Sequence, residues 1–300
     1  MKTINNIRSL RKFLLAIFFP LTVFLFSACD KIEEPYLIST GNADTAACPA
    51  PEFPEITTHI KRVLLEDYTG HTCVNCPSAA VISHDLKEQY GDQLVLIAVH
   101  AGFFAKPANT GNYTFDFRTT AGTAWDDQFG IGRIGNPNGM VNRRKINNTF
   151  VVPPSGWSGA VDGMVAEVPQ LDIQIINEYT ADGNKLCTHV QTNFLQAIDK
   201  NLKLIVAITE DSIVAPQKNN DPLVGATPEI LDYVHMHALR ANITSTWGTP
   251  VADNGTSEVV NSYKYLFNST MKPKNCTVVA FVYDSDTYEV IQAAEQKVIN

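Results

Sequence analysis

The chain has 300 residues, 45% of them hydrophobic and 18% charged, and this composition is typical of a globular protein with room for two domains. The net charge of −8 and the lack of any block of lysine or arginine argue against nucleic acid as the main partner.

The first residues have the pattern of a lipoprotein signal peptide, predicted over residues 1–28. Basic residues precede the apolar run Phe13–Phe26, which is shorter than the roughly 20 residues that a comfortable bilayer span requires. The run ends in Phe26-Ser27-Ala28-Cys29, which resembles a bacterial lipobox and predicts lipidation of Cys29. Several acyl chains on one cysteine would form a stable membrane anchor. Cleavage after Ala28, with Cys29 as an ordinary thiol, is the alternative.

Residues 29–57 are the expected lipidated tether and linker. The acidic stretch 30–34 resembles signals that send Bacteroidetes lipoproteins to the cell surface, and a merely solvated tether is the alternative. Pro49, Pro51 and Pro54 follow without hydrophobic periodicity, as in a linker. The predicted location is the cell envelope, as an outer membrane lipoprotein, with exposure at the cell surface left open.

A βαβ unit is predicted around a Cys-x-x-Cys motif. Residues 60–67 are rich in Val and Leu, as in a strand buried on both faces, and residues 93–100 have the same character. Between them, residues 78–90 place apolar side chains at helical spacing, and Pro77 suits a first helical turn. This order predicts two parallel strands joined by a right-handed crossover.

Cys73 and Cys76 stand between the first strand and the helix, which is the arrangement that thiol–disulfide oxidoreductases use. A helix N-terminus has unpaired N–H groups and a partial positive charge, which stabilise a thiolate on the first cysteine. The two intervening residues allow the second thiol to attack a mixed disulfide formed at the first. The motif therefore predicts redox chemistry.

After the second strand the regular pattern is interrupted. Residues 101–130 are polar and aromatic and predict a loop-and-helix excursion over one edge of the sheet. Pro137 precedes a short apolar strand about 60 residues after the cysteines, where thioredoxin-like folds carry a cis-proline, and a trans turn proline is the alternative. Residues 155–168 repeat at helical spacing and close the expected N-terminal domain, 58–168.

In the remaining part of the chain, residues 169–300, the hydrophobic pattern changes to a period of two. Asp182-Gly183 marks a hairpin turn. Short strands at regular spacing, without a convincing helix, predict an antiparallel β-sandwich as a C-terminal domain. The expected strands are 171–179, 186–194, 202–210, 233–242, 257–266, 277–283 and 289–298.

Three motifs together resemble the 28-kilodalton outer-membrane protein-related lipoprotein family of Bacteroidetes. They are the runs Glu66–Pro77, Gly135–Arg143 and Tyr233–Arg240, and the resemblance covers residues 55–300. It implies an α/β thioredoxin-like N-terminal domain followed by an all-β, immunoglobulin-like sandwich.

The wider likeness to thioredoxins implies roles for individual residues. Cys73 matches the nucleophilic cysteine, Cys76 matches the resolving cysteine, and Pro137 matches the cis-proline that abuts the disulfide. Asp67 lies six residues before Cys73, at the offset of the buried carboxylate that assists proton transfer from the resolving thiol. Glu66 takes that role if the strand register shifts by one.

Other residues near the cysteines depart from thioredoxin. Val74-Asn75 replaces the Gly-Pro pair, so the redox potential does not carry over. His71, when protonated, could favour a thiolate on Cys73 and shift the couple toward an oxidant. A solvent-facing loop histidine is the simpler expectation.

Metal binding is a weaker interpretation of the same residues. A structural zinc site needs four ligands, and no second Cys or His pair at short spacing accompanies Cys73 and Cys76. His235 and His237 have a spacing compatible with metal binding on one strand face, but a packed or edge-strand pair is favoured. We expect neither a metal nor a cofactor.

Three further cysteines, Cys48, Cys187 and Cys276, are left once the motif pair and lipidated Cys29 are assigned. An odd number in an exported protein implies at least one free thiol. A Cys187–Cys276 disulfide is one option, and the pairing stays open.

Two functions follow from these patterns. The first is a thiol–disulfide oxidoreductase that is tethered to the membrane through Cys29 and acts on thiols or disulfides of exported proteins. The second is a non-enzymatic surface lipoprotein that binds a partner protein, in which Cys73–Cys76 is a structural disulfide. The enzymatic character of the chain stays open between them.

Overall fold

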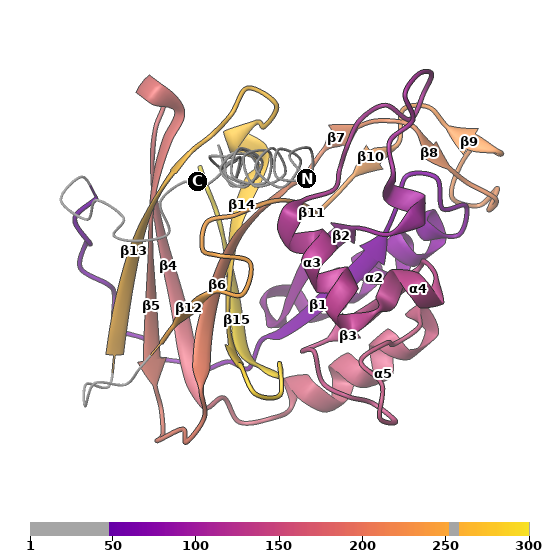
Figure 1. Cartoon of the computed structure of the whole chain (residues 1–300). Coiled ribbons are helices and arrows are strands. Elements are labelled where there is room, and N and C mark those ends of the chain that lie inside the picture. Colours follow the sequence, from indigo (N-terminus) through magenta and orange to yellow (C-terminus); the bar gives the residue numbers. More distant parts are fainter. Residues whose placement is uncertain (1–47, 252–257, 300) are drawn as a thin grey trace, which may run out of the picture. The chain divides into compact units, whose positions relative to one another are not determined.

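The computed structural model describes residues 48–251 and 258–299, and its largest element is an eight-stranded sheet (Figure 1). The strand order is β15-β14-β6-β11-β2-β1-β3, with β12 paired to β6 outside this path. These strands are β1 (Val63–Thr69), β2 (Leu94–His100), β3 (Asn138–Val141), β6 (Leu202–Glu210), β11 (Ala238–Asn242), β12 (Thr249–Pro250), β14 (Cys276–Asp284) and β15 (Val290–Lys297).

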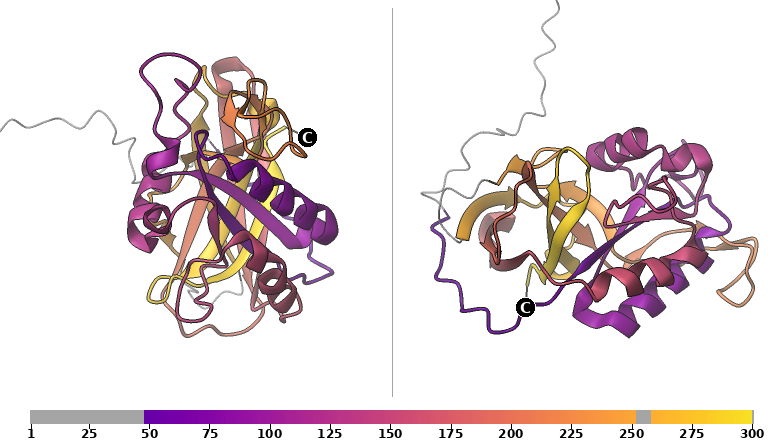
Figure 2. Two further views of the ribbon diagram at one scale, coloured as in Figure 1. Left: turned by 90° about the vertical axis from the view of Figure 1, so that its right-hand side faces the viewer. Right: turned by 90° about the horizontal axis from the view of Figure 1, so that it is seen from below.

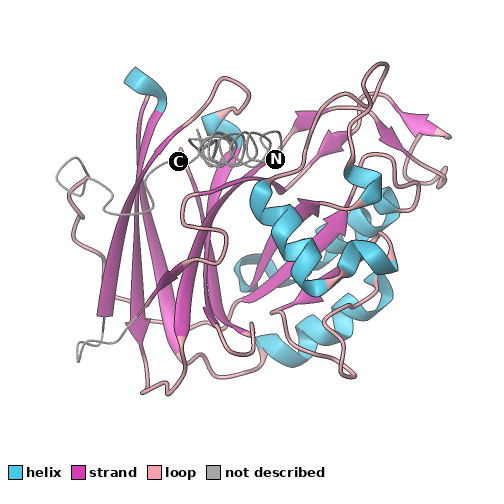
Figure 3. Ribbon diagram, in the orientation of Figure 1, coloured by secondary structure: helices cyan, strands magenta, loops and turns pink. Residues whose placement is uncertain are grey.

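The described α-helices all lie before residue 166, and Figure 3 shows them together on one side of the ribbon. The α-helices are α2 (Cys76–Tyr90), α3 (Thr120–Phe129), α4 (Ile131–Ile134) and α5 (Pro154–Val165). Short 3₁₀ turns are η3 (Gly91–Gln93), η4 (Phe103–Ala105), η5 (Asp182–Asn184) and η6 (Pro273–Asn275). The helices predicted at 78–90 and 155–168 are therefore confirmed, with ends shifted by a few residues.

The predicted βαβ unit is confirmed. β1 and β2 are parallel, with Leu65 opposite Leu96, and α2 connects them through η3. β3 runs antiparallel to β1 on its other side, with Tyr68 opposite Asn138. The predicted excursion after β2 consists of η4, an irregular stretch and α3.

The alternation of side chains along β1 explains how the helices cover the sheet. Val63 and Leu65 belong to an apolar cluster with residues of α2 and α5, whereas Leu64 and Tyr68 pack with Trp125 of α3 on the opposite face. Successive residues of a strand point to opposite faces, so β1 contributes to two cores. Figure 2 shows α3 on one side of the sheet and α2 with α5 on the other.

A second sheet packs on the C-terminal part of the large one. It has three antiparallel strands in the order β13-β5-β4: β4 (Leu171–Thr180), β5 (Lys185–Phe194) and β13 (Glu258–Leu266). Its inward residues Leu171, Ile173 and Leu186 share a buried cluster with Leu204 of β6 and Val278 of β14. The two layers bury the period-two apolar positions that the sequence shows in this region.

A C-terminal immunoglobulin-like β-sandwich is not confirmed. Strands β6, β14 and β15 extend the sheet of the βαβ unit instead of closing a sheet of their own, because β11 joins β6 to β2. The junction has a parallel pair, Ala238 opposite Ala98, and the Ala98 N–H donates to the His237 carbonyl at 2.8 Å. An unpaired edge of β2 would leave backbone groups without partners, and β11 satisfies them.

The expected division between residues 168 and 169 falls between α5 and β4. The described residues, 48–251 and 258–299, belong to one compact unit, and the large sheet contains strands from both sides of that position. The predicted signal peptide 1–28 lies outside the described residues, as does most of the tether 29–57.

Two small ladders interrupt the connection between β6 and β11. β7 (Ile213–Val214) pairs with β10 (Val234–His235), and β8 (Gln217–Lys218) pairs with β9 (Glu229–Ile230). The single strand predicted at 233–242 is thus divided into β10 and β11, because His237 has a φ of 52° that breaks the extended backbone. The other strands predicted in the C-terminal part are confirmed.

Candidate functional site

Cys73 and Cys76 form a disulfide at the start of α2, with their Cα atoms 5.4 Å apart. The Cys73 N–H donates to the Gly70 carbonyl at 2.9 Å, which folds the chain into a tight turn after β1. Pro77 occupies the first helical turn, and no acidic residue stands in that turn. The partial positive charge of the helix end would stabilise a thiolate on reduced Cys73.

The disulfide is buried. Cys73 and Cys76 are each 2% exposed, whereas Val74 and Asn75 between them face solvent. The backbone of the excursion closes one side, since the Thr72 N–H and Oγ both donate to the Phe104 carbonyl, at 3.1 and 2.8 Å. A Cβ on Gly70 would lie 2.4 Å from the Phe104 carbonyl carbon, so glycine is required for this approach.

Strand alternation separates the two acidic residues that precede the cysteines. Asp67 follows Val63 and Leu65 at even spacing and faces the side of the sheet covered by α2, the helix that begins at Cys76. Glu66 faces the opposite side, where its carboxylate accepts two hydrogen bonds from Arg143, at 2.8 and 2.7 Å. Asp67 is thus the residue on the cysteine face, and Glu66 belongs to a buried ion pair.

Burial raises the pKa of Asp67 to about 7. The side chain is 6% exposed, and its Oδ1 atom has no hydrogen-bond partner. A carboxyl group that titrates near neutral pH can both accept and return a proton under physiological conditions.

We expect Asp67→Asn to remove a pH-dependent cost of folding. The folded protein holds the Asp67 proton up to about pH 7, whereas the unfolded chain releases it near 3.8, so wild-type stability falls as the pH rises between these values. When the pH is raised from about 4 to 8, the free energy of unfolding of the variant should increase by roughly 2–4 kcal/mol relative to that of the wild type. Urea denaturation of both proteins at the two pH values measures the change, and a difference that does not vary with pH would contradict this account.

Pro137 lies at the end of the sheet where the cysteine turn begins. The Asn136–Pro137 peptide bond is cis, as predicted. The Asn136 side-chain amide donates to the carbonyls of Thr69 and Ala101, at 3.0 and 3.3 Å, and so ties this loop to the C-terminal ends of β1 and β2. Asp67, Cys73, Cys76 and Pro137 are therefore gathered at one end of the βαβ unit.

The prediction that His71 faces solvent is wrong. His71 is 1% exposed, and its Nε2 lies 3.1 Å from the Lys106 carbonyl oxygen. Burial lowers its pKa, so the ring is neutral at neutral pH and provides no positive charge for a thiolate.

His71 belongs to an aromatic cluster that the sequence patterns did not reveal. Phe117 stacks on His100 at 4.3 Å, lies 4.4 Å from His235, and approaches His71 at 5.9 Å between ring centroids. Burial lowers the pKa of His235 to about 4 and that of His100 well below its ordinary value. These rings come from four separate segments, so no local spacing predicts their meeting.

His235 and His237 do not form a metal pair. His235 packs against Phe117, whereas the His237 Nδ1 lies 3.4 Å from Asp211 Oδ1. Across residues 48–251 and 258–299, no group of three His, Cys, Asp or Glu side chains is placed to hold a metal ion.

The remaining cysteines pair differently from the option considered above. Cys48 is bonded to Cys187 of β5, so a Cys187–Cys276 disulfide is wrong. Cys276 stays a buried thiol, and burial raises its pKa to about 12. The expected free thiol is thus present, in an unreactive setting. Cys29, the predicted lipidation site, lies outside the described residues.

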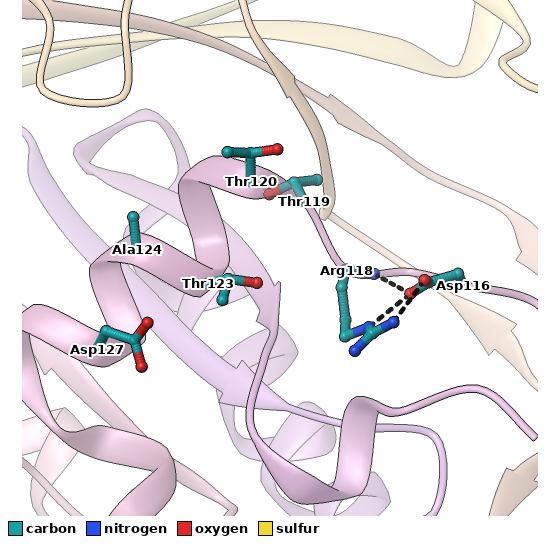
Figure 4. A pocket seen from close by; sticks show the side chains of 7 residues that line it. All are labelled: Asp116, Arg118, Thr119, Thr120, Thr123, Ala124 and Asp127. Atoms are coloured by element: carbon teal, nitrogen blue, oxygen red, sulfur yellow. Dashed lines mark hydrogen bonds and ion pairs between the residues drawn. The ribbon is translucent and has the colours of Figure 1, made fainter. Parts of the chain in front are cut away.

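An open depression of about 520 Å³ lies at the N-terminal end of α3 (Figure 4). Arg118, which projects into it, donates to both carboxylate oxygens of Asp116, at 2.9 and 2.8 Å, so its charge is already neutralised. The lining contains neither the cysteines nor Pro137.

Among the described helices, none is long and apolar enough to cross a bilayer.

Comparisons with solved structures show proteins of similar fold. HBP35 of Porphyromonas gingivalis has a TM-score of 0.59 at 18% identity, over 80% of this chain and 76% of its own. Protein AGR_C_4864 of Agrobacterium tumefaciens has a TM-score of 0.50 at 14% identity, over 81% and 96% of the two chains. A domain of the outer membrane lipoprotein Omp28 from Porphyromonas gingivalis is 20% identical over 44% of this chain and 90% of its own, with a TM-score of 0.31.

Among curated proteins, none matches the chain. The model of the family described as outer membrane protein Omp28 matches residues 123–300, which is more than half of the sequence. The chain therefore belongs to the Omp28 family of outer membrane proteins.

Proposed function

We propose that this Omp28-family protein is an outer-membrane-anchored lipoprotein whose thioredoxin-like half performs thiol–disulfide exchange on exported proteins. The observation that carries the proposal is the Cys73–Cys76 disulfide at the N-terminus of α2, at the same end of the βαβ unit as cis-Pro137 and on the same face as Asp67. The βαβ unit with an antiparallel β3 supports the thioredoxin-like assignment. The anchor would be Cys29.

Each residue has a role in the proposed exchange. The Cys73 thiolate attacks a substrate disulfide, forms a mixed disulfide and releases one substrate thiolate. The Cys76 thiolate then attacks the Cys73 sulfur, which closes the Cys73–Cys76 bond and releases the second substrate thiol. Two electrons pass from the protein to the substrate. Asp67, with a pKa of about 7, takes the proton from Cys76 before this second attack.

We expect Cys73→Ala to abolish turnover. With dithiothreitol as the electron donor and insulin as the protein disulfide, the loss should be at least about 100-fold, since no neighbouring group replaces the nucleophile. Cys76→Ser should instead accumulate a mixed disulfide between Cys73 and an insulin chain, visible by mass spectrometry under non-reducing conditions. Wild-type protein without turnover, together with no mixed disulfide in Cys76→Ser, would contradict the proposal.

The burial of the cysteines favours a second candidate function. With 2% of each residue exposed, the pair could serve only as a staple in a non-enzymatic lipoprotein that binds a surface partner. The same insulin assay separates the two functions, because a staple gives no turnover in any variant.

A further inference from the structure

The connection between β6 and β11 is longer than the sheet requires. The two strands are antiparallel neighbours, and such neighbours need only about 2–5 connecting residues. Here residues 211–237, which we call the strap, leave the sheet and carry the two small ladders β7–β10 and β8–β9 (Figure 1). The extra length takes the chain to the cysteine turn.

Hydrogen bonds from the strap reach successive carbonyls of that turn. The Gln217 side-chain amide donates to the carbonyls of Cys73 and Gly70, at 2.9 and 3.3 Å. The Lys218 N–H donates to the His71 carbonyl at 2.9 Å, and the Asn220 N–H donates to the Val74 carbonyl at 3.1 Å. The strap thus covers the backbone on both sides of Cys73.

Strap residues near position 220 also contact the side chains of the motif. The Asn220 amide donates to the Asn75 Oδ1 at 2.7 Å, and the Ser78 hydroxyl of α2 donates to Asp221 at 3.0 Å. Glu229 on β9 accepts from the Tyr113 hydroxyl at 2.6 Å, which joins the strap to the excursion. Together these bonds close the space outside the buried disulfide.

Lys218 and Asn220 present their N–H groups as an extended polypeptide would. Residues two apart in a strand direct their backbone groups to the same side. The opposite edge of β8 is already paired with β9. The N–H of Asn219, which lies between Lys218 and Asn220 in the chain, points to that side and donates to the Pro228 carbonyl at 2.9 Å. The cysteine turn is therefore contacted by the free edge of a short strand.

The strap is held by polar contacts more than by apolar burial. Its side chains Leu223, Val214 and Leu231 are 95%, 63% and 58% exposed, whereas Gln217 and Asn219 are buried amides. The strap contributes Ala215 to a small buried apolar cluster, which also contains Phe117 and Ala238. Segments with little apolar burial open at lower free energy than core strands such as β6.

We propose that the strap is an intramolecular substitute for the substrate: it must lift before an extended segment of a protein substrate can reach Cys73. That segment would then donate its own alternate backbone N–H groups to the carbonyls of His71 and Val74. This inference rests on the proposed exchange function and names its regulation and its substrate class, an extended polypeptide.

The rate of disulfide reduction tests the strap. In the full-length protein, Gln217→Ala removes both side-chain bonds to the turn, and Gln174→Ala, whose amide donates to the Pro54 carbonyl at 3.0 Å, is the matched control. Tris(carboxyethyl)phosphine is the reductant, and alkylation with peptide mass spectrometry follows the pair at Cys73 and Cys76. We expect Gln217→Ala to be reduced about tenfold faster than wild type, since each lost hydrogen bond corresponds to a factor of roughly 2–10.

Two further measurements test the proposal even if the Gln217→Ala protein does not fold. Ser78→Ala removes one bond to the strap and should raise the reduction rate about threefold. In the wild type, hydrogen exchange at the Lys218 and Asn220 amides should be at least about 100-fold faster than at Val206 in β6. Reduction rates equal to that of Gln174→Ala, or strap amides as protected as β6, would overturn the proposal.

Insulin turnover by the same variants separates this inference from the proposed function. Faster reduction with faster turnover in Gln217→Ala supports both. Faster reduction without turnover in any variant overturns the exchange function, and the extended-polypeptide substrate with it. Turnover with unchanged reduction rates overturns the strap and leaves the exchange function standing.

Discussion

Replacing Arg143 by leucine is expected to destabilise the protein by about 3–5 kcal/mol, because it leaves the Glu66 carboxylate buried without its partner. Both side chains are 0% exposed, and two hydrogen bonds of 2.8 and 2.7 Å join them. The guanidinium also lies 4.8 Å from the ring centre of Trp125 and 4.9 Å from that of Phe281. Removal of the arginine therefore costs aromatic packing as well as charge pairing.

The neighbouring residue provides a matched control. Arg144 also binds two carboxylates, Glu167 and Glu289, but its side chain is 31% exposed. We expect Arg144→Leu to cost less than about 1 kcal/mol, as is usual for exposed pairs. The double variant Glu66→Leu/Arg143→Leu should recover most of the loss, since two apolar side chains replace a buried pair at little cost.

Urea denaturation monitored by tryptophan fluorescence measures all of these variants, and Trp125 reports directly on the Arg143 site. Equal losses for Arg143→Leu and Arg144→Leu would show that burial does not set the cost. A double variant less stable than Arg143→Leu would show that Glu66 contributes through other contacts.

Removal of the Cys48–Cys187 disulfide is the second change with a large expected effect. The bond closes a loop with a sequence separation of 139 residues and ties the segment before β1 to β5. A cross-link across so long a loop restricts the unfolded chain strongly, and its loss typically costs about 2–5 kcal/mol. We therefore expect Cys48→Ala/Cys187→Ala to lower the free energy of unfolding by that amount.

The Cys73–Cys76 disulfide is the control for this prediction, because its sequence separation is 3 and it restricts the unfolded chain little. Cys73→Ala/Cys76→Ala should cost clearly less in the same urea titration. Added dithiothreitol should destabilise the wild type but leave Cys48→Ala/Cys187→Ala almost unchanged. If Cys73→Ala/Cys76→Ala lost more free energy of unfolding than Cys48→Ala/Cys187→Ala, the Cys48–Cys187 bond would not be the main stabilising cross-link.

The local elements were predictable because their signals lie within short windows of sequence. The apolar runs at 63–69 and 94–100 are strands, Pro77 stands in the first turn of α2, and Pro137 is cis. Even the choice between Glu66 and Asp67 follows from alternation, once the side of the sheet that carries α2 is known. Asp67, which stands six residues before Cys73, therefore lies on the face of the sheet that α2 covers.

The remaining parts of the site depend on contacts between distant segments. Gln217 meets the Cys73 carbonyl across 144 residues, and no spacing pattern marks it as a partner. The two-residue strands of this connection appear only in the structure, since the sequence patterns predict strands at 202–210 and 233–242 and nothing between them. His71 was expected to be a solvent-facing loop histidine, but Phe117 and the Lys106 carbonyl enclose it.

The sequence by itself determined the Cys-x-x-Cys at a helix start, the βαβ unit and most of the strands, because hydrophobic periodicity and turn residues act over a few positions. The tertiary structure decided which strands share a sheet, which cysteines pair, and that residues 211–237 cover the cysteine turn. Those outcomes depend on the free energy of contacts between segments more than 100 residues apart, such as β2 with β11 and Cys48 with Cys187. Such contacts have no local signature, since many strand edges and thiols could pair and only the folded arrangement selects among them.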